Sequence, residues 1–373
     1  MEKGKKGKIA LGMISFAVLT VLLLFYLYYT FTLPTGRAGD CTRERFNTFY
    51  ALEDNTVDCV FIGSSGTDRY WVPAVAWNDC GITSYELTSG DNHVIYTKYL
   101  MQEALNRHDV KVFAVDLRTF CRDLSEFEPK YIRRLTDSMH FSVNKLKMTH
   151  EVLAATEAAG CENIDYDDLS YYYAPIKYHS SWSEKTLEDM TTIFPKSDTM
   201  GYLGYPFIYN VLERDIPEPV FTEDVMPISE GNIAIIDDLL EYCEAHDFKV
   251  VFFSTPMSGK HDTLAQINFA EQYLEERGYP VYNFNTEEMY EEIGWDYLDD
   301  LYNKNHCNFR GALKFTHYME DVFINEYNLE DHRNDPDQSR YQDWNDGFDN
   351  ILGYLNQYNP EHYEQYTKEI GRN

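Results

Sequence analysis

The sequence predicts an α/β domain in which helices cover both faces of a parallel sheet. Two patterns indicate this class: short apolar runs rich in β-branched and aromatic residues, and amphipathic helical stretches between them. Strands that alternate with helices pair in parallel, because a helical crossover returns the chain to the same end of the sheet. The roughly 290 residues from 42 to about 330 suffice for one large hydrophobic core. We therefore expect a single α/β domain at residues 42–330.

The expected elements follow one another regularly along this domain. Five segments have the composition of buried strands: residues 57–62, 82–87, 110–117, 249–254 and 280–282. Helical patterns lie at residues 93–106, 232–246 and 262–277, and a final one begins after residue 308. An acidic tail, residues 331–373, has the amphipathic pattern of a terminal helix that docks on the domain or on a membrane partner.

An insertion interrupts the alternation between about residues 119 and 229. It is rich in tyrosine and contains two helical patterns, near residues 143–159 and 183–193. Its aromatic segments would suit a lid that stacks on sugar rings, which makes Tyr178 and Trp182 candidate substrate-binding residues. The alternative is that the tyrosines pack the insertion against the sheet.

The first 33 residues predict a membrane anchor. Residues 1–8 carry four lysines, and residues 9–33 contain no charged side chain. About 20 apolar residues span a bilayer, whereas a signal peptide has an apolar region of only about 7–15 residues before its cleavage site. We expect an uncleaved transmembrane helix with residues 1–8 in the cytoplasm, because clustered lysines favour that side. A cleaved signal peptide is the alternative.

The composition excludes several functions. A net charge of −30 argues against nucleic acid as a partner and against binding of polyanions by charge alone. The seven cysteines show no CxxC spacing, and the histidines form no ligand cluster in the sequence, so we predict no metal. We also predict no cofactor.

A serine and a histidine far apart in the sequence form a candidate catalytic pair. The strand at residues 57–62 stops at Gly63, and the Gly-Ser-Ser turn presents Ser65 at the strand's carboxyl end, where ligands bind in open α/β sheets. His306 lies on a polar loop before the final helix and can reach across the sheet. A serine hydroxyl needs an adjacent base and a third group that orients this base.

These two motifs resemble those of the SGNH (GDSL-type) hydrolase superfamily. The resemblance is carried by the strand and turn that end at Ser65 and by the His-x-Asn-x-x-Gly-Ala segment that begins at His306. It covers roughly residues 55–328 and is greatest to the membrane-anchored DltD-like and alginate-acetylation-like branches of bacterial cell-envelope proteins. It implies a flavodoxin-like three-layer fold with Ser65 as nucleophile and His306 as base.

The chain departs from the superfamily's pattern at the residue that orients the histidine. By the resemblance an acid would lie three residues before the histidine, where this chain has Asn303. An asparagine accepts the imidazole N–H but brings no negative charge, and replacing the acid by its amide in a serine protease costs about 10⁴ in turnover. Three alternatives stay open: Asn303 orients the histidine less effectively than an acid would, an aspartate orients it in place of Asn303, or the site is degenerate. The candidate aspartates are Asp299, Asp300 and Asp116.

The oxyanion donors are also less regular than the resemblance implies. Beside the backbone N–H of Ser65 itself, the expected glycine of the second block corresponds to Gly90, a residue or two late. The third block, around Asp116, lacks the expected asparagine. Arg118 lies near a strand end, where it could hold a phosphate or carboxylate of a substrate, and an ordinary surface charge is the alternative.

Two hypotheses for the function follow. The first is an extracytoplasmic ester hydrolase or O-acyltransferase of the bacterial plasma membrane, which acts on a cell-envelope polysaccharide or polymer through an acyl-serine intermediate. Because DltD-like proteins act beside a multipass membrane O-acyltransferase, the resemblance implies such a partner. The second is a membrane-anchored binding or assembly protein of the cell envelope that has lost catalysis, and the asparagine at position 303 supports it.

Overall fold

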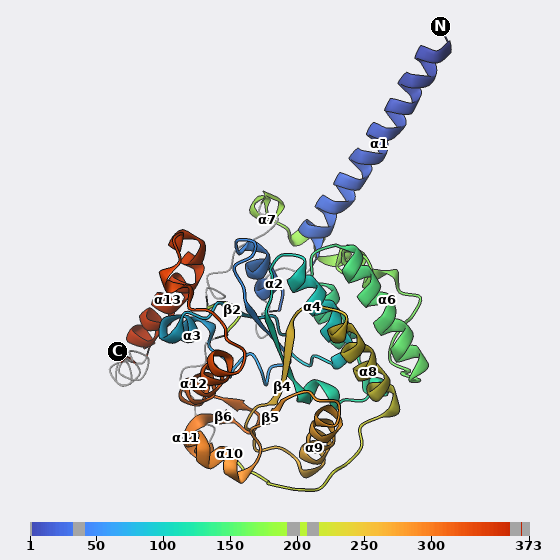
Figure 1. The fold of residues 1–373 in the computed structure, drawn as a ribbon. Helices are drawn as coiled ribbons and strands as arrows, with labels where there is room; N and C mark the ends of the chain where they lie inside the picture. Colours follow the sequence, from blue (N-terminus) through green and yellow to red (C-terminus); the bar gives the residue numbers. More distant parts are fainter. Residues whose placement is uncertain (1, 33–41, 192–201, 207–215, 359–366, 368–373) are drawn as a thin grey trace.

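A five-stranded parallel sheet forms the centre of the domain (Figure 1). The computed structural model describes residues 2–32, 42–191, 202–206, 216–358 and 367. The strands are β1 (Cys59–Ile62), β2 (Ser84–Glu86), β3 (Val112–Asp116), β4 (Lys249–Ser254) and β5 (Val281–Asn283). The α/β class and the parallel sheet predicted from the sequence are confirmed, and each strand lies within or beside its predicted segment.

The strand order is β2-β1-β3-β4-β5, so the direction of winding reverses between β1 and β3. β1 pairs with β2 on one side and with β3 on the other. In open α/β sheets, ligands bind outside the carboxyl ends of the strands at such a switch point. Ser65 follows β1 and Arg118 follows β3, so the topology alone brings both residues to this point.

Helices cover both faces of the sheet, as Figure 1 shows. On one face lie α3 (Pro73–Cys80) and α12 (Phe309–Asn325), and on the other lie α4 (Thr97–Leu105), α8 (Glu230–Glu244) and α9 (His261–Glu275). Further helices are α2 (Thr42–Ala51), α5 (Pro129–Thr136), α10 (Glu287–Glu292) and α11 (Tyr297–Asp300). A small antiparallel hairpin, β6 (Leu301–Asn303) with β7 (His306–Cys307), precedes α12.

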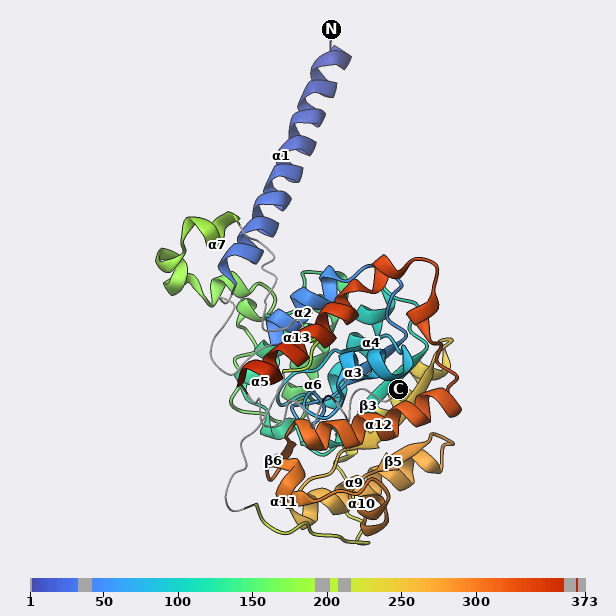
Figure 2. The same cartoon turned by 90° about the vertical axis from the view of Figure 1, so that its left-hand side faces the viewer.

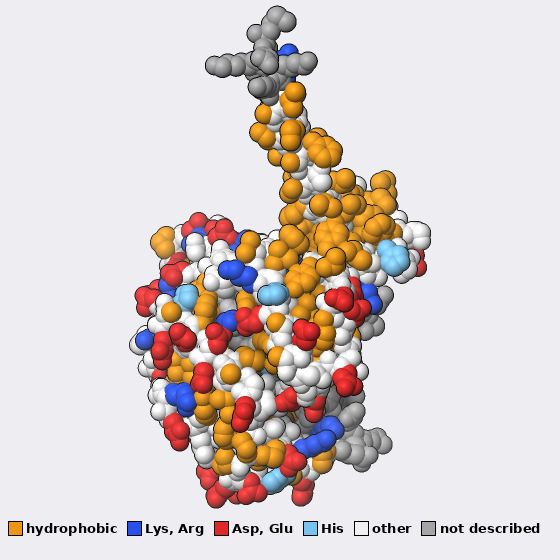
Figure 3. All heavy atoms as spheres, turned by 90° about the vertical axis from the view of Figure 1, so that its right-hand side faces the viewer, with side chains coloured by type: hydrophobic (Ala, Val, Ile, Leu, Met, Phe, Trp, Pro, Cys, Tyr) orange, Lys and Arg blue, Asp and Glu red, His pale blue; other side chains and the backbone are white. Residues whose placement is uncertain are grey.

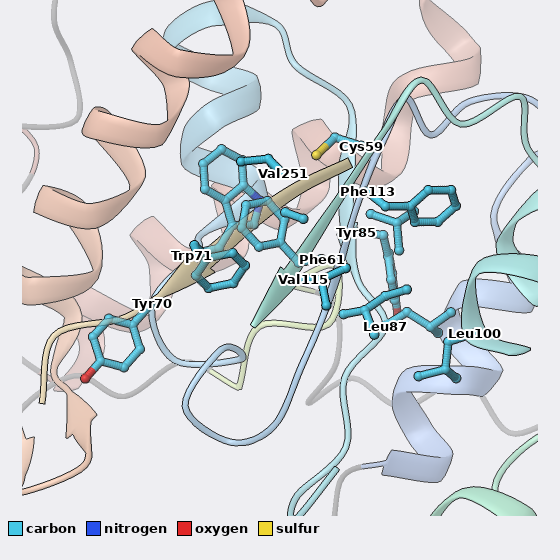
Figure 4. Close-up of a cluster of buried hydrophobic side chains, with 14 of the residues drawn as sticks. Cys59, Phe61, Tyr70, Trp71, Tyr85, Leu87, Leu100, Phe113, Val115 and Val251 are labelled. Atoms are coloured by element: carbon cyan, nitrogen blue, oxygen red, sulfur yellow. The ribbon is translucent and has the colours of Figure 1, made fainter. Parts of the chain in front are cut away.

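The core fixes both ends of the turn that carries Ser65. Ile62 ends β1, and Tyr70 and Trp71 follow the turn; all three are fully buried. The rings of Phe61 and Trp71 stack with their centroids 4.6 Å apart (Figure 4), and Phe323 of α12 packs edge-on against both. Because close-packed aromatic side chains cannot shift independently, this turn is held rigidly relative to the sheet.

The C-terminal helix α13 (Gln342–Tyr358) docks on α3 beside the β2 edge of the sheet. Trp344 is fully buried and donates its indole N–H to the carbonyl of Ser84 in β2 at 3.2 Å. Trp77 of α3 donates to Asn345 Oδ1 at 2.9 Å. An edge strand is thus covered instead of being exposed to other chains.

The N-terminal helix α1 (Glu2–Phe31) projects away from the domain (Figures 1 and 2). Its segment Gly7–Phe31 is long and apolar enough to cross a membrane. The side chains are exposed from Gly7 to Phe25, whereas Tyr28 and Tyr29 are buried against the domain. α1 is therefore seated on the domain by its last turns.

The insertion between β3 and β4 surrounds the base of α1. It contains α6 (Val143–Ala158), α7 (Leu187–Thr191) and the 3₁₀ segments η5 (Ala174–Ile176) and η6 (His179–Glu184). Both 3₁₀ segments contact α1. The aromatic side chains around these two segments, Tyr173, Tyr178 and Trp182, therefore pack on α1.

Candidate active site

Ser65 lies in a turn after β1 that requires a glycine. A Cβ on Gly63 would overlap the hydroxyl of Thr67 and lie 2.8 Å from Cβ of Asp116. This close approach allows Thr67 to donate to Asp116 Oδ2 at 2.8 Å, while the Thr67 N–H donates to the Ser64 carbonyl at 2.9 Å. The turn is thus tied to the end of β3, which fixes the position of Ser65.

The hairpin β6–β7 brings His306 and Asn303 to the same turn. The two residues pair across the hairpin, and His306 Nδ1 lies 2.9 Å from Asn303 Oδ1. At its start, α12 is capped by Asn308, whose side chain accepts from the Gly311 N–H at 3.2 Å. The histidine is therefore placed between a hairpin and a capped helix, both of which are rigid elements.

Ser65, His306 and Asn303 form one hydrogen-bonded chain. Ser65 Oγ lies 2.9 Å from His306 Nε2. The Asn305 N–H donates to Asn303 Oδ1 at 3.0 Å, which identifies this atom as the amide oxygen. Because an amide oxygen only accepts, His306 Nδ1 carries the proton, and Nε2 is free to accept the Ser65 hydroxyl proton. This is the tautomer that a general base needs.

The electrostatic environment keeps His306 neutral. Burial, together with the positive charges of Arg69 and Arg118, lowers the pKa of His306 to about 3. The neutral imidazole is therefore available as a base at all physiological pH values. The imidazolium that forms when it takes the proton is disfavoured, because no carboxylate contacts it among the described residues.

The two aspartates just before the histidine have other partners. Asp300 is buried, and its carboxylate accepts from Lys314 Nζ at 2.5 Å and from the Asp296 N–H at 2.7 Å. Asp299 is exposed and pairs with Arg310 at 3.1 Å. Neither contacts His306, so within the described residues Asn303 is the group that orients the base.

Asp116, like Asp299 and Asp300, has partners other than His306, and its carboxylate holds Arg118. Its carboxylate accepts from the Arg118 backbone N–H at 3.0 Å and lies 3.3 Å from Arg118 Nε. The guanidinium then contacts the carbonyls of Gly66, beside the serine, and of Asn305, beside the histidine. Arg118 therefore joins the two loops that carry the candidate nucleophile and base, and it also lines the cavity described next.

A cavity of about 780 Å³ opens beside Ser65 and His306. Among its described lining residues, only Met257 and Cys121 have apolar side chains, and none is aromatic. The charged groups that line it are Arg118, Arg122, Lys260, Lys304, Asp91, Asp123 and Glu126. Such a lining suits a hydroxyl-rich or charged substrate and offers no surface for a long acyl chain.

Asn92 is a better placed oxyanion donor than Gly90. Asn92 lines the cavity, whereas Gly90 does not, and a Cβ on Gly90 would lie 2.9 Å from a guanidinium nitrogen of Arg134. The Asn92 amide donates one N–H to the Gly63 carbonyl at 3.0 Å. A side-chain amide has two N–H groups, so the second is left for a ligand. The asparagine two residues after Gly90 is visible in the sequence, but the spacing expected from the superfamily led to Gly90 instead.

Tyr178 and Trp182, the predicted substrate-binding residues, lie apart from this cavity. Tyr178 packs in a cluster with Tyr28 of α1 and donates to Asp137 Oδ2 at 2.6 Å. The ring of Trp182 lies 4.9 Å from that of Phe31. Neither side chain lines the cavity, so the structure does not place them where they could stack on a substrate at Ser65.

One group of side chains in the described part of the chain could hold a metal ion. Asp79 of α3 and His317 and Glu320 of α12 each offer a ligand atom, and these atoms lie within 4.8 Å of one another. The group is formed where α3 packs on α12, and none of its members lines the cavity at Ser65. It therefore takes no part in the candidate chemistry.

The fold and the site define an α/β protein with a serine, a histidine and an asparagine in line at the switch point of a parallel sheet. No protein-family model matches the chain, and no curated protein matches it.

Proposed function

We propose that this protein is a membrane-anchored serine ester hydrolase or O-acyltransferase of the SGNH type, which acts on a polymer of the bacterial cell envelope. The observation that carries the proposal is the hydrogen-bonded chain from Ser65 through His306 to Asn303, with 2.9 Å at each step. It lies beside a polar cavity at the switch point of the sheet, which is the position expected for a substrate.

The proposed reaction has two halves. Ser65 Oγ attacks the ester carbonyl while His306 Nε2 takes the hydroxyl proton, and the resulting oxyanion accepts from the Ser65 backbone N–H and the Asn92 amide. The C–O bond to the alcohol then breaks, and the alcohol leaves with the proton from His306. Water, or a hydroxyl of an acceptor polymer, attacks the acyl-serine in the same way and releases Ser65. Asn303 holds the imidazole in the required tautomer throughout.

The lining of the cavity supports a small acyl group on a polar carrier. Long acyl chains need an apolar channel, and the described lining has few apolar side chains. By the superfamily resemblance, acetyl or D-alanyl groups fit, with a multipass membrane O-acyltransferase as a partner that would supply or receive the acyl group. Polymer hydroxyls would reach the cavity from outside the membrane.

The proposed position in the cell is supported by α1. Its apolar segment has the length of a membrane span, and the four lysines before Ile9 favour the cytoplasmic side. We therefore place the N-terminus in the cytoplasm and the domain outside the plasma membrane.

A second function, a binding or assembly protein without catalysis, is favoured by a specific observation. Asn303 contributes no charge to His306, and burial with two nearby arginines lowers the pKa of this histidine to about 3. Proton transfer from Ser65 is thereby made harder. In this alternative the polar cavity binds an envelope polymer without cleaving it.

Labelling with a fluorophosphonate separates the two functions, because this probe requires an activated serine but not the right substrate. We expect the full-length protein in detergent micelles to be labelled, and we expect Ser65→Ala and His306→Ala to abolish labelling. Ser64→Ala is the matched control: Ser64 is the adjacent serine, and its hydroxyl accepts from the Gly66 N–H without contacting His306. A folded wild-type protein that resists labelling would support the binding function instead.

A further inference from the structure

Exposed apolar side chains gather on the part of the insertion that surrounds α1, here named the juxtamembrane lobe (residues 141–191). Figure 3 shows hydrophobic side chains concentrated where α1 meets the domain. The large apolar side chains exposed on the lobe are Phe141, Val143, Leu169, Ile176, Trp182 and Leu187. Elsewhere outside α1, the described residues expose only Val220, Phe221 and Val225 in the segment before α8, Leu298 in α11 and Ile324 in α12. Val143 lines a separate pocket with Lys98 and Asp238, whereas the apolar side chains that gather at the base of α1 form a surface of the kind that marks an interaction site.

The lobe contacts α1 several residues before the helix ends. The Tyr173 hydroxyl donates to the backbone carbonyl of Leu24 at 2.7 Å, and the Tyr26 hydroxyl donates to the carbonyl of Met190 at 3.0 Å. Nearer the end of α1, Trp182 lies against Phe31. The lobe therefore extends along α1 from Phe31 back to Leu24.

A count along α1 shows the depth that these contacts reach. A hydrocarbon core of about 30 Å takes about 20 helical residues at 1.5 Å each. If it starts after Lys8, the last charged residue before the apolar run, such a span ends near Tyr28. Leu24 then lies roughly 6 Å inside the apolar layer. Side chains that contact α1 at Leu24 and Tyr26 must lie at or within the membrane boundary, whichever side the domain occupies.

We propose that the juxtamembrane lobe is inserted in the lipid interface on the domain's side of the membrane, with Trp182 and Leu187 among the lipid-contacting side chains. The occupant of the apolar surface is the bilayer itself, because the surface continues directly from the membrane-spanning segment of α1. Tryptophan and tyrosine are the side chains favoured at this depth. Apolar burial drives the insertion, so it does not depend on anionic lipids.

The inference rests on the membrane anchoring proposed above and not on the ester chemistry. It fixes the domain in one orientation instead of leaving it on a free tether. Figures 1 and 2 both show β6 and α9, which flank the cavity, at the end of the domain remote from α1. The cavity would then lie away from the lipid surface, on the side of soluble or wall-attached polymer.

Tryptophan fluorescence tests the proposal, because Trp182 is 41% exposed whereas the other four tryptophans are at most 7% exposed. We would reconstitute the full chain in phosphatidylcholine vesicles that carry a doxyl group near the headgroup end of the acyl chain. We expect the doxyl lipid to quench a component of the emission that aqueous iodide does not reach, and Trp182→Phe to remove this component. Adding phosphatidylglycerol or salt should leave the quenching unchanged.

Two single reporters in the Trp182→Phe background sharpen the test. Leu187→Trp places an indole on the lobe, and Leu298→Trp places one on α11, at an apolar site that is also exposed. We expect doxyl lipid to quench the first and iodide to quench the second. Quenching of Trp182 and Leu187→Trp by iodide alone would overturn the proposal. Extraction of the protein from vesicles by carbonate would instead show that the anchoring itself fails.

Discussion

Replacing Asn303 with aspartate should raise the pKa of His306 and accelerate the reaction of Ser65. The uncharged amide lies 2.9 Å from His306 Nδ1, and the pKa of His306 is lowered to about 3 by burial and by two arginines. A carboxylate about 4 Å from the imidazolium charge contributes ~4 kcal/mol at an effective dielectric constant of about 20. This energy corresponds to ~3 pKa units, so the pKa of His306 in Asn303→Asp should reach ~6.

The assay is the rate constant of fluorophosphonate labelling, measured from roughly pH 4 to pH 9. The reaction requires neutral His306. In the wild type the neutral form dominates over this whole range, so titration of His306 should leave the rate unchanged. In Asn303→Asp the rate should fall as the pH decreases through ~6, where His306 takes up a proton. Above that pH we expect a gain of up to ~10⁴, the size of the loss when a serine protease has its acid replaced by the amide.

Two further variants control for charge and for packing. Asp299→Asn changes the charge of the same loop at an exposed position that pairs with Arg310 and not with His306, so it should leave the rate unchanged. Asn303→Ala removes the hydrogen bond to the imidazole and should slow labelling. If folded Asn303→Asp reacts no faster than the wild type and its pH profile stays flat, Asn303 is not the group that orients His306.

Three more outcomes follow from the described contacts. Asn92→Ala should slow labelling by ~10²–10³, the usual effect of removing one oxyanion donor, without shifting the melting temperature by much. Arg118→Lys should slow labelling by roughly 10- to 100-fold, because a lysine cannot bridge Gly66 and Asn305 as the guanidinium does, and one lost charged hydrogen bond is worth ~1.5–3 kcal/mol. Burial lowers the pKa of His93 to about 4, so the unfolded chain binds this proton first, and His93 alone should lower the free energy of unfolding in urea by ~3 kcal/mol as the pH drops from ~6.5 to about 4. His93→Gln should flatten that part of the profile.

The sequence was sufficient to predict the alternating strands and helices that form the framework of the domain. The apolar run before Gly63 and the polar segment around His306 predicted a strand with a turn and a loop before a helix, and the structure brings Ser65, His306 and Asn303 together there. The strand, the turn and the loop are local features, because each depends on the composition of a few neighbouring residues, whereas the meeting of Ser65 with His306 was expected from the resemblance to the SGNH superfamily. The parallel pairing of the strands is also implied by the helical crossovers.

Other features that depend on contacts between distant segments could not be predicted from the sequence. Tyr178 and Trp182 have the composition of a sugar-binding lid, but aromatic side chains gather equally well beside a membrane helix, and only the fold distinguishes the two. Asn92 was overlooked because the chain path after β2, and not residue spacing, decides which side chain reaches the cavity. The sequence also could not show that the Asp300 carboxylate accepts a hydrogen bond from Lys314 instead of from His306.

The separation of Ser65 and His306 by 241 residues has a consequence for biogenesis. At translation rates of about 5–20 residues per second, the histidine leaves the ribosome roughly 12 to 48 seconds after the serine. α13, which closes the β2 edge, is made later still. On the proposed mechanism, a nascent chain therefore carries an unactivated serine until His306 has been made, and any truncated product that ends before the β6–β7 hairpin would not react through Ser65.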